Sequence, residues 1–253
     1  MFSRFNREPI GLVSRGDPNM GFYFILLFLL GSQILSGRSL PPTRQIITVL
    51  GCFIVAVTIH EFMHAFAAMR LGDDTAVRLG RLTLNPGVHF EPFGFFGMVM
   101  ISLGYSFIGW GKPVPVNTGR LRGTGQEGRQ RSMALVAFAG PLSNIAMAAV
   151  AAIPIHLMHN TSAQAGDVYY VVYWFFWVNA LLASFNAIPI PPLDGYRILV
   201  GILPAFWTRV LAPLEKYGFI ILIVLFFIGG RFGSSLTNSM IDPIRSLILR
   251  MLP

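Results

Sequence analysis

The composition of this 253-residue chain excludes an ordinary soluble domain. Hydrophobic residues make up 54% of the chain and charged residues only 12%, whereas soluble domains carry about 25% charged residues. The mean hydropathy of +0.62 points to lipid as the solvent. The formal net charge of +8 does not indicate nucleic-acid binding, because membrane proteins collect Lys and Arg in their cytoplasmic loops.

Apolar runs divide the chain into membrane segments. A helix needs about 20 apolar residues to cross a bilayer. Runs of this kind lie at 19–36, 45–69, 132–158, 168–188 and 216–230. The first run follows a long polar lead without a small-x-small cleavage site, so we expect no signal peptide. The C-terminal stretch 240–252 mixes two arginines with Ile and Leu, which suits the plane of the membrane interface.

A sixth apolar run, 93–109, is shorter and contains four glycines. If it does not span, the loop 70–131 is cytoplasmic and the loop 159–167 is external. The first loop is rich in Lys and Arg, and the second contains neither, in agreement with the positive-inside rule. We therefore predict an all-α polytopic membrane protein of about five to six transmembrane helices, with a re-entrant or β-like segment before the span 132–158. One domain is expected, with its core at 45–200.

Residues 60–64 read His-Glu-Phe-Met-His inside the run 45–69. Positions four apart lie on the same face of a helix, so His60 and His64 can offer imidazole nitrogens to one zinc ion. Glu61 lies close to that face and can take a proton from a zinc-bound water. The lone cysteine, Cys52, excludes both a disulfide and a cysteine zinc site. Ionisable groups inside a membrane are costly and tend to mark function.

A catalytic zinc needs a third protein ligand and an open position for water. Glu91, Glu127 and Glu215 are candidates, but they lie in loops or at span ends. Asp194 is better placed, because the prolines after 168–188 break the helix and let the carboxylate turn back. Under the topology above, His64 lies about 8 Å from the cytoplasmic end of its span, and Asp194 arrives at the same end.

These motifs resemble those of the site-2 proteases, the intramembrane zinc metalloproteases, in the compact bacterial and archaeal branch without PDZ or CBS domains. The matching segments are His60–Ala65, Gly80–Pro86, Gly109–Asn117, Ala139–Asn144 and Asn186–Gly195. The chain departs from the family pattern at Tyr196, where a second glycine is common, and at Glu91, where aspartate is common.

The resemblance implies hydrolysis of peptide bonds in transmembrane helices of membrane-protein substrates. It implies one zinc per chain on His60, His64 and Asp194, with Glu61 as base and Asn186 holding the oxyanion. Gly140 and Asn144 match a motif on the neighbouring helix, as residues lining the active site or simply as small packing residues. A prokaryotic cell membrane, with the active site near the cytoplasmic side, is the expected location.

Three other functions remain open at this point. A metal-binding scaffold without proteolysis would not need Glu61. A divalent-metal transporter would spread its ionisable groups along a path, often between internal repeats, and no repeat is visible. Another membrane-embedded zinc protease would use a downstream glutamate in place of Asp194. The substrate and the oligomeric state are not encoded in any motif.

Overall fold

The computed structural model of the chain describes residues 41–104, 108–204 and 206–224, together with a few isolated positions near its ends. Within these ranges it contains helices and no β-strand. In chain order the elements are α2 (Thr43–Arg70), α3 (Thr75–Arg78), η1 (Pro86–His89), α4 (Pro92–Ser102), α5 (Gly125–Met158), η2 (Ser162–Ala165), α6 (Asp167–Asn186), α7 (Asp194–Ile202) and α8 (Phe206–Ile223).

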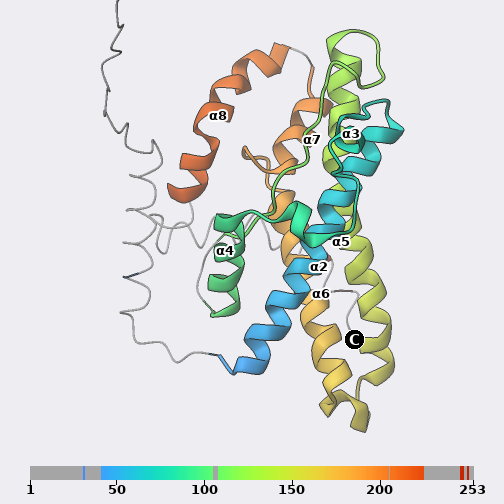
Figure 1. Cartoon of the computed structure of the whole chain (residues 1–253), viewed down its shortest axis with the longest axis vertical. Helices are drawn as coiled ribbons and strands as arrows, with labels where there is room; N and C mark the ends of the chain where they lie inside the picture. The colour runs from blue at the N-terminus through green and yellow to red at the C-terminus, as the bar shows by residue number, and fades with distance from the viewer. Residues whose placement is uncertain are drawn as a thin grey trace, which may run out of the picture. The chain divides into compact units, whose positions relative to one another are not determined.

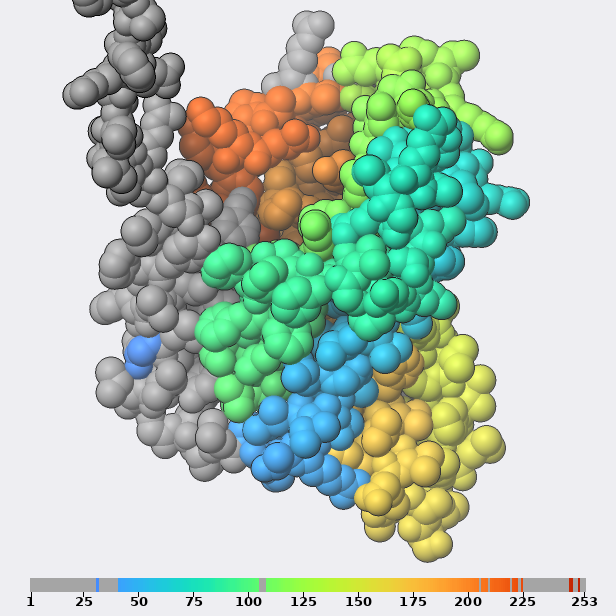
Figure 2. All heavy atoms as spheres, in the orientation of Figure 1, coloured from blue at the N-terminus to red at the C-terminus, as the bar shows by residue number. Residues whose placement is uncertain are grey.

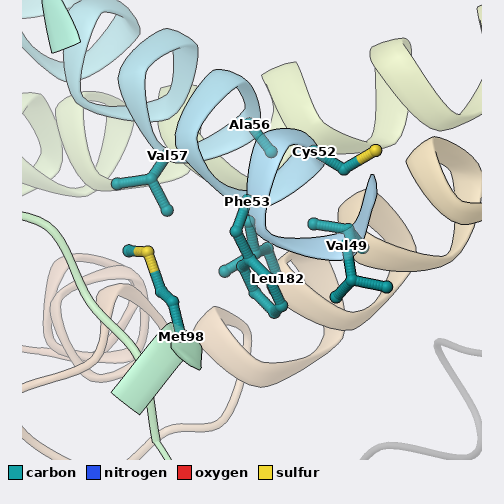
Figure 3. Packing of buried hydrophobic residues seen from close by; sticks show 8 residues of the cluster. Val49, Cys52, Phe53, Ala56, Val57, Met98 and Leu182 are labelled. Carbon is teal, nitrogen blue, oxygen red and sulfur yellow. The ribbon is translucent and has the colours of Figure 1, made fainter. Parts of the chain in front are cut away.

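Helices α2, α5 and α6 pack side by side and form the centre of the fold (Figure 1). Between α5 and α6, small residues such as Ala148 and Ala152 are buried against Phe176. Small side chains let two helix backbones approach closely, which is how helices associate in lipid. Between α2 and α6, Phe53 is buried beside Leu182 (Figure 3).

The same three helices are long and apolar enough to cross a membrane, and they are the candidates of this kind among the described residues. They confirm the helices expected at 45–69, 132–158 and 168–188. Large apolar side chains on their outer faces remain exposed, for example Ile47 at 67% and Leu157 at 76%. Exposed apolar surface on this scale indicates a molecule whose natural solvent is lipid.

Helix α4 occupies most of the short run 93–109 and packs against α2 (Figures 1 and 2). Its 11 residues extend about 16 Å, roughly half of the apolar thickness of a bilayer. Its glycines allow close approach to the returning chain: a Cβ atom at Gly94 would lie 1.8 Å from the Trp110 carbonyl oxygen, and one at Gly97 would lie 1.9 Å from that of Ile108. The β-like alternative is not seen in the described residues, and the re-entrant one stays a prediction.

The C-terminal part differs from expectation. Helix α8 begins at Phe206, well before the predicted start at 216, and it contains Pro213, Glu215 and Lys216. It is not among the candidate spans, and residues 225–230 lie outside the described part. The segments 19–36 and 240–252 also lie almost wholly outside it. The helices above all belong to the unit Leu40–Pro253, one of the two into which the chain divides. The number of spans and the single domain remain predictions.

Candidate metal centre

Three ligand atoms converge between α2 and α7. His60 Nε2 lies 3.1 Å and His64 Nε2 lies 3.2 Å from Asp194 Oδ2. The two Nε2 atoms are 3.0 Å apart. Both histidines are buried, and the aspartate side chain is 16% exposed. Within the described ranges this is the one group of three or more His, Cys, Asp or Glu that could hold a metal ion.

The turn between α6 and α7 brings the aspartate to the histidines. Helix α6 ends at Asn186, and the proline-rich turn leads into α7, whose first residue is Asp194. The chain folds back tightly here, because a Cβ atom at Gly195 would lie 2.3 Å from the Ala187 carbonyl oxygen. A glycine after the aspartate is therefore needed for this close approach. Tyr196, the departure from the family pattern, donates its hydroxyl to the Leu211 carbonyl at 3.1 Å and so ties α7 to α8.

Neighbouring groups fix the tautomer of each imidazole. His64 Nδ1 donates to the Val136 carbonyl at 2.8 Å, and a carbonyl can only accept. His60 Nδ1 lies 2.6 Å from Asn144 Oδ1. The amide nitrogen of Asn144 in turn donates to Asn179 Oδ1 at 2.9 Å. With hydrogen on Nδ1, each Nε2 presents a lone pair to the centre. This is the arrangement that holds metal-ligating histidines in proteins.

The donor set fits zinc. Asp194 Oδ2 is buried and accepts no hydrogen bond from the described residues. It faces two nitrogen lone pairs, so three electron-rich atoms meet at one point, and a cation between them would relieve their repulsion. Two imidazoles and one carboxylate, with a fourth position left for water, are typical of catalytic zinc sites.

Gly140 on α5 makes room for these ligands. A Cβ atom there would lie 2.4 Å from His64 Nε2 and 2.6 Å from His60 Cε1. Both residues of the Gly140 and Asn144 motif lie directly against the imidazoles. This position favours the interpretation that they line the active site. Asn144 is fully buried, and its amide bridges α2 to Asn179 on α6.

Glu61 and Asn186 line the same cavity as the ligands, which has a volume of about 380 Å³. The Glu61 side chain is buried, and its Oε2 accepts a hydrogen bond from the Val114 backbone N–H at 3.0 Å. Asn186 Nδ2 donates to the Leu182 carbonyl at 3.0 Å. The alternative third ligands are not in the metal group. One of them, Glu91, instead caps α4 by accepting from the Gly94 backbone N–H.

Two buried charged residues that the sequence analysis did not single out hold the loop that carries Val114. The Arg81 guanidinium donates to the carbonyls of Lys112 at 3.0 Å and Pro113 at 2.9 Å, and also to that of Val88. Asp73 is fully buried and accepts from the Asn117 backbone N–H at 2.6 Å. Both groups anchor loop 111–117 over the cavity and thereby position the N–H that binds Glu61.

Comparison with known proteins gives the family. The chain is 37% identical over 178 residues to YwhC of Bacillus subtilis, which carries the name of a predicted zinc metalloprotease; the match covers 68% of this chain and 77% of that protein. It is 32% identical over 204 residues to Rip2 of Mycobacterium tuberculosis, covering 76% of this chain and 72% of the relative. The model of Peptidase family M50 matches residues 151–229, a range that includes Asn186 and Asp194. The chain belongs to this family, the site-2 proteases.

A relative from Methanocaldococcus jannaschii, also named as a predicted zinc metalloprotease, is 30% identical over 158 residues, which is 62% of this chain and 71% of the relative. No solved structure matches the chain. The family and the names of its relatives agree with the geometry: His60, His64 and Asp194 are positioned to bind a metal ion.

The M50 member should contain about one zinc per chain when purified in detergent. Replacing His60, His64 or Asp194 by alanine should each lower the zinc content measured by elemental analysis, because two ligands bind far more weakly than three. His156→Ala is the control, since this histidine lies at the far end of α5. Full zinc content in Asp194→Ala would show that the third ligand is a different residue.

Gly140→Ala should lower zinc affinity at least tenfold, because its methyl group would displace both imidazoles. The matched control is Gly51→Ala in α2, where an added Cβ meets no atom within 4 Å. The control should keep its zinc, because the added methyl displaces no atom. It should also fold, because alanine favours a helix over glycine by about 1 kcal/mol. Competition with a chelator measures both affinities, and equal values for the two variants would refute the close approach at Gly140.

Proposed function

We propose that this M50 member is an intramembrane zinc endopeptidase that cleaves transmembrane helices of membrane-protein substrates. The observation that carries the proposal is the position of Glu61: a carboxylate in the same cavity as the three ligand atoms, on a helix able to span a membrane. Neither a metal-binding scaffold nor a transporter needs a base there.

Glu61 is the general base in this proposal. When bound, zinc would polarise the scissile carbonyl and lower the pKa of a bound water to about 7. The Val114 N–H holds Glu61 Oε2. The other oxygen, Oε1, then takes the proton of the attacking water and later delivers a proton to the leaving nitrogen.

Asn186 is assigned to the oxyanion. An amide nitrogen carries two hydrogens, and the Leu182 carbonyl uses one of them. Because Asn186 lines the metal-site cavity, we assign the second hydrogen to the oxygen that becomes negative during the reaction. Loss of one such donor slows catalysis by roughly 10²-fold, which is the effect we assign to Asn186→Ala.

The substrate helix has to unwind before its carbonyls can reach the ligands, because they are held in its own hydrogen bonds. Loop 111–117 lines the cavity and is the edge against which we propose that the extended stretch pairs. Pro113 and Pro115 lack N–H groups, and the Val114 N–H already binds Glu61. The pairing therefore relies mainly on the remaining carbonyls and on the Val116 N–H.

We further propose that the active site faces the cytoplasm of a prokaryotic cell. Helix α3, in the Lys- and Arg-rich connection between α2 and α5, lies towards the end of the bundle where α7 also lies (Figure 1). The connection between α5 and α6, at the other end, contains no Lys or Arg. This bias supports a cytoplasmic active site and a re-entrant α4.

Glu61→Gln should retain zinc but lose at least roughly 100-fold in the rate of cleavage of a model transmembrane substrate, because an amide cannot accept the proton. Zinc content and cleavage are measured on the same preparation in vesicles. The zinc-loaded variant cleaving at the parent rate would remove Glu61 as the base and with it the proposed mechanism.

Topology can be measured with single cysteines at the exposed positions Thr124 and Ser162, in a Cys52→Ser background. A membrane-impermeant thiol reagent applied to intact cells should label position 162 and leave position 124 unlabelled until the membrane is opened. The reverse pattern, with position 124 labelled from outside and position 162 protected, would contradict the cytoplasmic loop 70–131 and the re-entrant run 93–109.

A further inference from the structure

A second cavity adjoins the metal-site cavity on the side of α8. It has a volume of about 470 Å³ and is formed by α5, α7, α8 and the loop before α5. The two cavities share Met133 and Arg197 in their walls. We refer to it as the basic cavity; its other polar lining residues are Thr118, Gln126, Arg129, Gln130, Tyr196, Thr208 and Glu215.

The basic cavity has an excess of positive charge. Arg129 and Arg197 contribute two guanidinium groups, and neither forms an ion pair within the described ranges. Glu215 is the one acidic residue in the wall. Burial, and then the neighbouring Glu215 carboxylate, raise the pKa of the Tyr196 phenol to about 12. The phenol is therefore neutral, and the net charge of the wall is positive.

The cavity also holds an unsatisfied amide. Gln130 Nε2 is bonded to the Thr208 hydroxyl at 2.8 Å, and Gln130 Oε1 is buried without a partner in the described residues. A hydroxyl can donate as well as accept, so the amide can turn over and present its NH₂ group to the cavity instead. In that orientation it adds a donor for a carboxylate.

Arg197 connects this charge to the reaction site. It follows Asp194 by three residues on α7, and residues at this spacing are neighbours on a helix face. A peptide extended from the metal site into the basic cavity advances about 3.3 Å per residue. The side chain that meets Arg197 is then about two to four residues from the scissile bond.

We propose that the basic cavity binds an acidic side chain, Asp or Glu, on the cytoplasmic flank of the cleaved bond, and that this contact selects substrates. The inference rests on the proposed function. A substrate side chain fits better than a lipid headgroup, because the basic cavity shares Met133 and Arg197 with the metal-site cavity, where the peptide has to lie.

The test uses the zinc-loaded parent in phosphatidylcholine vesicles. The bond that is cleaved is first located in a model transmembrane substrate with Asn on its cytoplasmic flank. Three versions of this substrate then differ at one position, two to four residues from that bond on its cytoplasmic side. That position carries Asp, Asn or Lys. We expect kcat/KM to be about fivefold higher with Asp than with Asn, and lower still with Lys, as for a partly exposed ion pair. Arg197→Glu should reverse the order.

Arg131→Glu is the matched control, because it makes the same charge change on α5 at an exposed residue outside the cavity. It should keep the parent's order. Arg129→Glu supplies a second variant from another wall and should weaken the preference for Asp, so the test does not depend on how well Arg197→Glu folds.

Equal rates for the three substrates, with the neutral one cleaved, would overturn the basic cavity as a subsite and leave the proposed function standing. No cleavage of any substrate by the zinc-loaded parent would remove the function and this inference together. In vesicles containing phosphatidylglycerol, an activation that needs Arg197 but ignores substrate charge would assign the cavity to a lipid headgroup and refute the proposal.

Discussion

The fold depends on one constraint, which is that three electron-rich atoms meet in a buried place. His60 Nε2, His64 Nε2 and Asp194 Oδ2 lie about 3 Å apart. Hydrogen bonds on the far side of each imidazole keep the lone pairs pointed inward. A cation between them would relieve their repulsion, so metal binding should stabilise the packing of α2, α5, α6 and α7.

Glycine lets the surrounding elements come close enough to build that centre. Gly140 leaves space for the imidazoles, and Gly195 lets α7 fold back beneath the end of α6. Gly94 and Gly97 perform the same task for α4 against the chain that returns to the active site. In each case the helix backbone meets another group where a methyl would collide, so helix propensity has been given up for geometry.

The loop above the centre connects structure to chemistry. Arg81 and Asp73 satisfy its backbone with buried charges, which is costly unless each charge is fully hydrogen-bonded. The outcome is a fixed Val114 N–H on the Glu61 carboxylate. Arg197 borders both the metal-site cavity and the basic cavity. Positioning of the base and selection of the substrate would thus involve different residues that line one cavity.

The sequence by itself determined the membrane class, the three central helices and the residues of the metal centre. Those properties follow from local patterns: apolar length, the four-residue spacing of His60 and His64, and prolines that end a helix before Asp194.

Only the tertiary structure decided which groups serve the centre from a distance. Arg81, Asp73 and Asn179 bond partners on other segments, and no spacing rule links residues so far apart in the chain. The same holds for the start of α8 at Phe206, where apolar length pointed to 216, and for the wall shared by the two cavities. Local periodicity shows which face of a helix is apolar, but the neighbour of that face is chosen by packing across the whole chain.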